Sequence, residues 1–156
     1  MKIRDITPND ILIYSWLTHE MQNKINTGSP DTSKPSLIVA ITTDDDVPVG
    51  LMELSSIDFQ NKNARFGIMI GAPTGRRFFL GAVKAFLKRC FIDLDLHKIY
   101  FRVPADNEHA LKVNRYFGFT EEGIDREAVY CSGQFKDIVG FSMTKEEFGR
   151  KWNEWD

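Results

Sequence analysis

The sequence contains little of what marks several large classes of protein. It has only two cysteines, Cys90 and Cys131, and three histidines among 156 residues. The cysteines lie too far apart to suggest a disulfide framework, and no His/Cys spacing matches a metal site, so we predict no metal. We expect Cys90 to be a small buried thiol, because it lies on the apolar side of a predicted helix.

Charge and hydropathy argue against two kinds of partner. The net charge is −2, without the basic excess that suits a phosphate backbone, so we predict no nucleic-acid binding. No apolar run approaches the ~20 residues needed to span a bilayer, which argues against a membrane protein. The first residues include an acid where a signal peptide would have its apolar core. We therefore expect a cytoplasmic protein.

The remaining pattern predicts one domain, residues 1–156, of the α/β (α+β) class. We expect a mixed and mostly antiparallel central sheet of about seven strands, with helices on both faces. Predicted strands cover residues 2–6, 37–41, 48–57, 64–70 and 98–103, and a hairpin joins 119–130 to 134–143. A first predicted helix begins after residues 7–10 and ends at about 24. Two more run from about 75 to 91 and from 107 to 117, and a short helical tail covers 145–152.

The most informative segment runs from Gly67 to Phe91. An apolar strand passes through the turn 71–77 into a long helix whose apolar side chains repeat at helical spacing. A strand that leads into a helix in this way presents free backbone N–H groups and the positive end of the helix dipole to an anion, and Arg76 and Arg77 add charge. The segment predicts a phosphate site, although its turn has few glycines.

The order of these elements and several motifs resemble the Gcn5-related N-acetyltransferase superfamily along nearly the whole chain. The residues that carry the resemblance are Pro48–Leu54 with Ala64–Ile70, Leu94–Tyr100, Asn107-Glu108-His109-Ala110, Gly118-Phe119 and Glu122-Gly123. The last four are similar to the branch that holds ribosomal-protein N-terminal and spermidine acetyltransferases. The resemblance implies acetyl-CoA as co-substrate and a primary amine as acceptor, which could be a peptide N-terminus, a polyamine or an amino sugar.

The resemblance also implies where acetyl-CoA binds. Main-chain groups of Ile68, Met69 and Ile70 would pair with the pantetheine arm, and one N–H would polarise the thioester carbonyl. The diphosphate would lie at the start of the long helix. There the family's Gln/Arg-x-x-Gly-x-Gly/Ala turn aligns with Thr74-Gly75-Arg76-Arg77-Phe78-Phe79. Because Arg77 and Phe79 replace small residues, either Arg77 neutralises phosphate itself or bulk narrows the pocket.

A second departure concerns the acid that protonates the leaving thiolate. Many members of the family place a tyrosine seven residues after the first residue of the short helix, where this chain has Asn114. Asparagine cannot act as an acid. Asn107 and Asn114 share one face of the predicted helix and could line the cofactor groove, or Asn107 could simply cap the helix and Asn114 lie on the surface.

Glu53 is our candidate general base, since it extends from a strand whose neighbours Met52 and Leu54 face the other way. The alternatives are a solvated carboxylate at this position and a water molecule as the base. The expected enzyme would act on a small-molecule or peptide amine, and a homodimer is a further predicted partner state. The rival hypothesis is a non-catalytic binding module of the same fold, in which the bulky turn has closed the diphosphate site.

Overall fold

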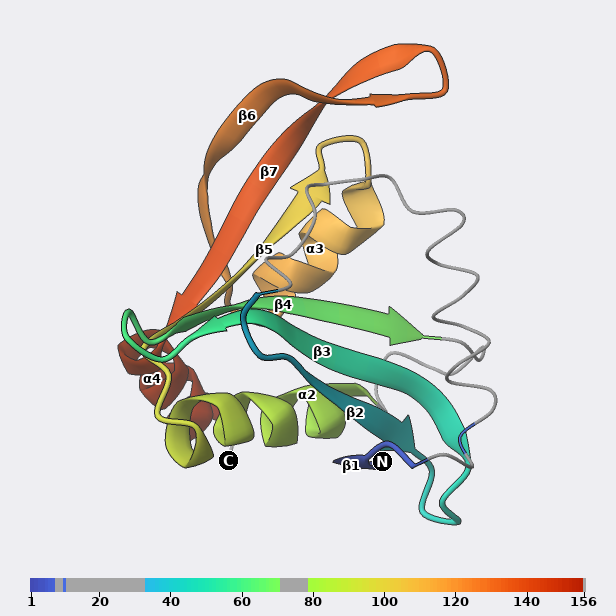
Figure 1. Cartoon of the computed structure of the whole chain (residues 1–156), viewed down its shortest axis with the longest axis vertical. Coiled ribbons are helices and arrows are strands. Elements are labelled where there is room, and N and C mark those ends of the chain that lie inside the picture. Colours follow the sequence, from blue (N-terminus) through green and yellow to red (C-terminus); the bar gives the residue numbers. More distant parts are fainter. Residues whose placement is uncertain (8–9, 11–32, 71–78, 156) are drawn as a thin grey trace.

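The structure is a computed structural model that describes residues 1–7, 10, 33–70 and 79–155 (Figure 1). Its strands are β1 (Lys2–Asp5), β2 (Leu37–Thr42), β3 (Pro48–Asp58), β4 (Asn63–Ile70), β5 (Lys98–Pro104), β6 (Thr120–Cys131) and β7 (Gln134–Thr144). Its helices are α2 (Phe79–Lys88), the π-helical turn η2 (Arg89–Asp93), α3 (Glu108–Tyr116) and α4 (Lys145–Trp155). The helix that we predict before residue 24 lies outside the described residues.

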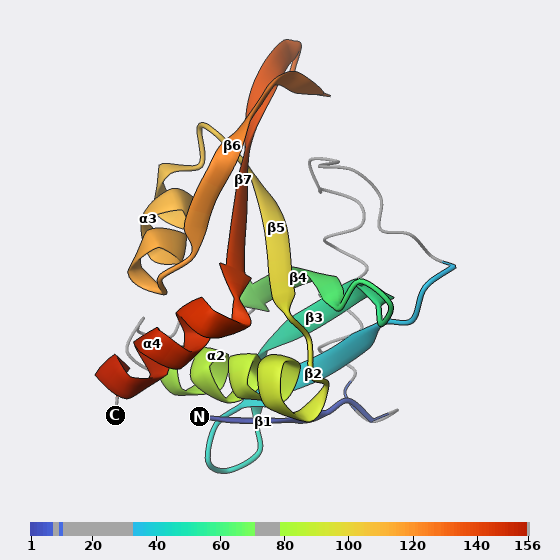
Figure 2. The same cartoon turned by 90° about the vertical axis from the view of Figure 1, so that its left-hand side faces the viewer.

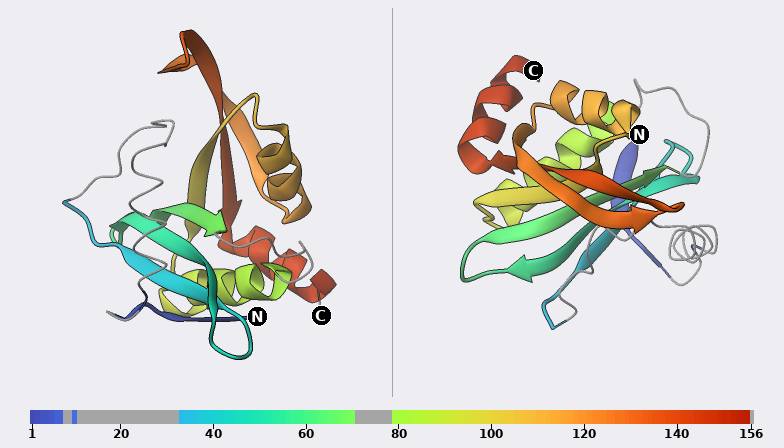
Figure 3. Two further views of the ribbon diagram at one scale, coloured as in Figure 1. Left: turned by 90° about the vertical axis from the view of Figure 1, so that its right-hand side faces the viewer. Right: turned by 90° about the horizontal axis from the view of Figure 1, so that it is seen from above.

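These strands form one seven-stranded sheet, the number that we predict, and their order in it is β1-β2-β3-β4-β5-β7-β6. Every neighbouring pair is antiparallel except β4 and β5, which are parallel because α2 and η2 connect them. The described helices α2, α3 and α4 all lie on one face of the sheet (Figures 2 and 3). No helix among the described residues is long and apolar enough to cross a membrane.

The core lies between that face and the helices. Buried side chains alternate along β5, where Ile99, Phe101 and Val103 point into the core, which is the period of two that predicts a half-buried strand. The long helix differs from the prediction near its end, because a π-turn replaces α-helix from Arg89. Cys90 is fully buried on this turn, as predicted, and burial raises the pKa of its thiol to about 12.

Two turns confirm predictions made from glycine positions. Gly118 follows α3 with φ +84°, a left-handed conformation that glycine adopts freely, and its N–H donates to the Arg115 carbonyl at 3.0 Å. Ser132 and Gly133 join β6 to β7 with φ values of 52° and 76°, the two positive angles of a type I′ hairpin turn. The resulting hairpin extends well beyond the other strands (Figure 1).

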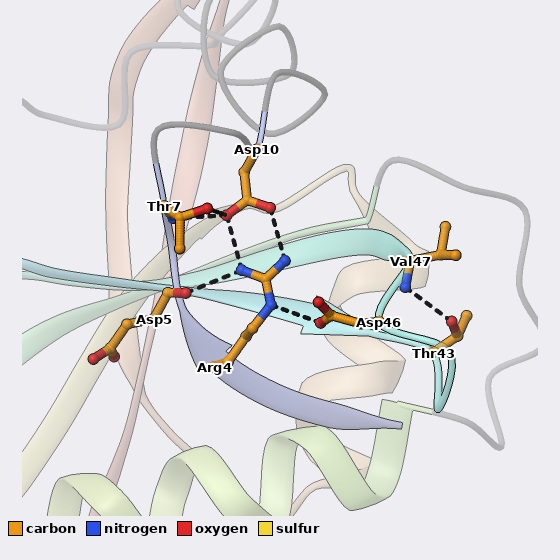
Figure 4. Close-up of polar contacts among 7 residues, drawn as sticks. All are labelled: Arg4, Asp5, Thr7, Asp10, Thr43, Asp46 and Val47. Carbon is orange, nitrogen blue, oxygen red and sulfur yellow. Dashed lines mark hydrogen bonds and ion pairs between the residues drawn. The ribbon is translucent and has the colours of Figure 1, made fainter.

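An ion-pair cluster fixes the N-terminal strand to the chain that follows it (Figure 4). The Arg4 guanidinium donates to both carboxylate oxygens of Asp10, each at 2.8 Å, and to Asp46 at 2.7 Å. The backbone N–H of Thr7 also donates to Asp10, at 2.7 Å. These donors hold the pKa of the Asp10 carboxyl well below its usual range, and Arg4 is the largest cause.

Replacing Asp10 with asparagine should destabilise the fold by roughly 2 kcal/mol at neutral pH, since a charged hydrogen bond to a buried group is lost. A lowered pKa stabilises the folded state above the unfolded pKa of ~3.9 and stops doing so as pH falls through the folded value. The difference in Tm between wild type and Asp10→Asn should therefore be largest near pH 7 and shrink below about pH 4. Thermal denaturation across pH measures this, with the exposed Asp44→Asn as control; a difference that is constant with pH would contradict it.

Candidate active site

The β4–β5 ladder stops after three residue pairs. Asn63, Ala64 and Arg65 pair with Lys98, Ile99 and Tyr100, whereas β4 continues against β3 as far as Ile70 and β5 continues against β7 as far as Pro104. The two strands thus begin side by side and then diverge (Figure 1). Beyond Arg65 the edge of β4 that faces β5 has no strand partner among the described residues.

Register determines which backbone groups face the gap between β4 and β5. The Lys62 carbonyl accepts the N–H of Lys98 at 3.1 Å, so it points toward β5. Backbone groups of successive residues in a strand point to opposite edges, and β4 pairs with β3 without interruption from Arg65 to Ile70. The N–H and C=O groups of Ile68 and Ile70 therefore face the gap, whereas those of Met69 face β3.

Aromatic rings fill the core side of this divergence. Phe66 and Phe101 are the first residues of β4 and β5 beyond the paired segment, and their ring centroids lie 5.9 Å apart. Phe86 of α2 contacts Phe66 at 5.7 Å, and Phe119 contacts Phe101 at 4.8 Å. Phe141 of β7 stacks on Phe101 at 5.4 Å. Packed rings therefore cover the helical side of the sheet where the two strands begin to diverge, whereas Ile68, further along β4 on the same face, is 39% exposed.

The opposite side of the sheet carries Glu53, next to a small apolar cluster around Ala40 and Leu51. Met52 and Leu54 are fully buried in the core and Glu53 is half-buried on the other face, as we predict from the strand pattern. Glu53 lies directly across from Gly67 of β4. Further along this face, Lys98 and Arg102 of β5 form ion pairs of 2.6 Å with Glu122 and Asp125 of β6.

Helix α3 supplies the two asparagines. Asn107 caps the helix, since its side-chain oxygen accepts the N–H of Ala110 at 3.1 Å. Asn114 is only 9% exposed, so the interpretation of Asn114 as a surface residue is wrong. Its backbone carbonyl accepts the N–H of Phe119 at 3.1 Å, which ties the end of α3 to the start of the following strand. The role of Asn114 at the cofactor groove stays a prediction.

The predicted diphosphate turn is described only at its end. Thr74, Gly75, Arg76, Arg77 and Phe78 lie outside the described residues. The side chain of Phe79 is 5% exposed and packs in the core with Ala82 and Val83. Its bulk therefore points into the core, so the expectation that Phe79 narrows the pocket is wrong. Among the described residues no group of three His, Cys, Asp or Glu side chains is placed to hold a metal ion.

The sheet splits between the parallel strands β4 and β5, and helix α2 follows β4 in the chain. This arrangement is typical of the acyltransferase class that the sequence resembles. Residues 4–120 match the family described as acetyltransferase (GNAT) domain, and the chain belongs to this family.

Comparison with curated relatives gives the same family. The spermidine N(1)-acetyltransferase of Vibrio cholerae serotype O1 is 35% identical over 102 residues, which cover 64% of this chain and 58% of that protein. The putative ribosomal N-acetyltransferase YdaF of Bacillus subtilis is 28% identical over 64% of this chain and 55% of its own length. These alignments thus span little more than half of either relative.

Solved structures match the fold along almost all of the chain. A point mutant of the spermidine N-acetyltransferase SpeG from Vibrio cholerae superposes with a TM-score of 0.79 over 97% of this chain and 99% of that chain, at 23% identity. The spermidine N-acetyltransferase from Vibrio cholerae in complex with CoA and spermine superposes with a TM-score of 0.76 over 94% and 96%, also at 23% identity. At this identity the likeness establishes the fold.

Proposed function

We propose that this protein is an acetyl-CoA-dependent N-acetyltransferase acting on a primary amine. The observation that carries the proposal is the edge of β4 beyond Arg65, where the backbone groups of Ile68 and Ile70 face a gap that no described strand fills. An extended pantetheine arm with two amides suits such an edge, because it can exchange hydrogen bonds with it as a strand does. Cytoplasmic location and homodimer formation stay predictions.

The length of β4 suggests where along the strand the thioester would lie. The arm would start from the diphosphate at the beginning of the long helix, near Arg76 and Arg77, and run back along β4. Strand residues advance ~3.3 Å each, so an extended arm of some four or five residue lengths ends near Phe66 to Ile68. The N–H of Ile68 would then donate to the thioester oxygen and hold its charge as the amine attacks.

The chemistry requires the amine nitrogen to bond to the thioester carbon, a proton to leave the nitrogen, and the carbon–sulfur bond to break. Glu53, or a water molecule beside it, takes the proton. The CoA thiolate leaves and is protonated from solvent, because Asn114 donates hydrogen bonds but supplies no proton. A buried amide at this position suits stabilisation of the thiolate and the arm.

Isothermal titration with acetyl-CoA tests the proposal. We expect micromolar affinity, and a loss of at least about tenfold in the Arg76→Ala/Arg77→Ala double variant, since two charge-assisted contacts to phosphate are removed. Absence of binding at millimolar acetyl-CoA would overturn the proposal of an enzyme and favour the non-catalytic binding module.

Glu53→Gln provides a narrower prediction about the base. Measured with a known acceptor, kcat should fall by a factor of roughly 10² or more at neutral pH, because general bases typically accelerate a reaction by about 10²–10⁴. The affinity for acetyl-CoA should stay unchanged, since Glu53 lies on the sheet face and the arm lies at the strand edge. An unchanged kcat with an unchanged pH profile would remove Glu53 from the mechanism and assign the proton to water.

A further inference from the structure

The narrow end of the gap between β4 and β5 is held by contacts that the proposed mechanism does not use. Three segments meet there: the turn between β3 and β4, the loop between η2 and β5, and the start of α4 (Figure 1). The carbonyl of Lys62 in the turn accepts the N–H of His97 at 2.7 Å and that of Lys98 at 3.1 Å. The carbonyl of His97 accepts the N–H of Lys145, the first residue of α4, at 2.8 Å. These backbone bonds join the half of the sheet formed by β1 to β4 to the half formed by β5 to β7.

One carboxylate adds side-chain contacts at the same place. Asp95 accepts a hydrogen bond from the ammonium of Lys62 at 2.9 Å and another from that of Lys145 at 2.7 Å. Lys62 and Asp95 both have a left-handed backbone, with φ values of 54° and 51°, although neither is glycine. Such residues are uncommon and persist where surrounding contacts hold them. Because Lys62 precedes β4 and Lys145 follows β7, Asp95 binds one lysine from each half of the sheet.

The position of these contacts gives them leverage over the gap. The first pair of the β4–β5 ladder, Asn63 with Lys98, directly follows Lys62 and His97. Beyond the ladder the free part of β4 runs from Phe66 to Ile70, which is ~16 Å at ~3.3 Å for each residue. A rotation of ~10° at the narrow end would move the far end of this segment by ~3 Å, which exceeds the ~0.5 Å range of hydrogen-bond lengths. A small change at the narrow end therefore decides whether the two edges of the gap fit a ligand.

We propose that Asp95 is a positioning residue, which together with Lys62 and Lys145 fixes the angle between β4 and β5 and so the width of the gap. The inference rests on the proposed function, because the pantetheine arm is the ligand that needs this width. A protein whose competent form is only partly populated binds with an affinity lowered by that fraction. Asp95 is 61% exposed, and one exposed ion pair changes such a population by at most about fivefold.

Isothermal titration with acetyl-CoA tests the role of Asp95. Asp95→Asn should raise the Kd by about threefold to fivefold, and Asp95→Lys, which brings three cations together, by about tenfold or more. Asp106→Asn and Asp106→Lys are the matched controls, because Asp106 is 58% exposed and forms an ion pair of 2.7 Å with Lys136, within one half of the sheet. Both controls should stay within about twofold of wild type. An unchanged Kd in both Asp95 variants, or an equal rise in the controls, would overturn the proposal.

Exchange of the charges separates positioning from general damage. The triple variant Lys62→Asp/Asp95→Lys/Lys145→Asp restores both ion pairs with their signs reversed. Its new carboxylate at the first residue of α4 also suits the positive end of that helix. We expect the Kd for acetyl-CoA to return to within about threefold of wild type. A triple variant that folds and binds no better than Asp95→Lys would overturn the proposal.

The angle can also be measured without a ligand. Spin labels on Val47→Cys, in the turn between β2 and β3, and on Lys112→Cys, in α3, lie at exposed positions in the two halves. The background is Cys131→Ser, in which the remaining thiol is buried. In double electron–electron resonance, Asp95→Lys should broaden the distance distribution, whereas Asp106→Lys should leave it as in wild type. An unchanged distribution in Asp95→Lys would overturn the proposal whether or not acetyl-CoA binds, and failure of wild type to bind acetyl-CoA would overturn the proposed function.

Discussion

Replacing Ile68 with proline should lower kcat for acetyl transfer by about 10²–10³ while the protein still folds. Proline removes the N–H of residue 68, which faces the gap and would hold the oxyanion, and loss of one such donor typically has an effect of this size. The same N–H contributes nothing to the ladder with β3, so β4 behaves toward proline as an edge strand does. The residue before it is Gly67, which adapts readily to a following proline.

Met69→Pro is the matched control for this prediction. The backbone N–H of Met69 faces β3, so its removal breaks a hydrogen bond within the sheet. We expect Met69→Pro to lose about 1–3 kcal/mol of stability, because its partner group on β3 is left without a hydrogen bond, and Ile68→Pro clearly less. Thermal denaturation and steady-state kinetics on both variants measure the two effects. Full activity in Ile68→Pro would show that the donor is elsewhere.

Phe101→Ala should have the largest effect on stability, a loss of about 3–5 kcal/mol. Phe101 contacts the rings of Phe66, Phe119 and Phe141, and it joins β5 to β4 where backbone pairing has ended. Truncation would leave a cavity at that junction. For a chain of this length the loss corresponds to a fall in Tm of about 6–20 °C.

Phe135→Ala is the control for the truncation. Phe135 is 65% exposed near the end of the β6–β7 hairpin, and its ring contacts that of Tyr130. We expect its loss to change stability by less than about 1 kcal/mol. Differential scanning calorimetry compares the two variants directly. Equal destabilisation by both would contradict a special role for the rings at the divergence of β4 and β5.

Most of the fold could be predicted from local sequence patterns, because strands, helix caps and tight turns depend on interactions between residues close together in the chain. Alternation of buried side chains predicted β5, a side-chain oxygen at a helix start predicted the cap at Asn107, and Ser132-Gly133 predicted the hairpin turn. The pairing of Arg4 with Asp10 was missed, because neither residue has a local pattern that points to the other. This ion pair depends on the path that the chain takes after β1.

The candidate site was predicted only in outline for the same reason. The motif around Ile68–Ile70 indicates a cofactor edge, but which of the three residues faces the gap depends on the register with Lys98 across 36 residues, from 62 to 98. The bulk of Phe79 suggested a narrowed pocket, whereas its side chain packs in the core.

The short ladder between β4 and β5 makes this a sheet of two halves, β1 to β4 and β5 to β7, joined by three residue pairs and a group of rings. A substrate that pairs with the free edge of β4 would act as a missing piece of the fold. Binding and folding are then linked, because a ligand that binds the native state alone stabilises it by RT ln(1 + [L]/Kd), ~2.7 kcal/mol at about a hundredfold excess over Kd. The free protein would thus be the looser form, and a cell rich in acetyl-CoA would hold it closer to a continuous sheet.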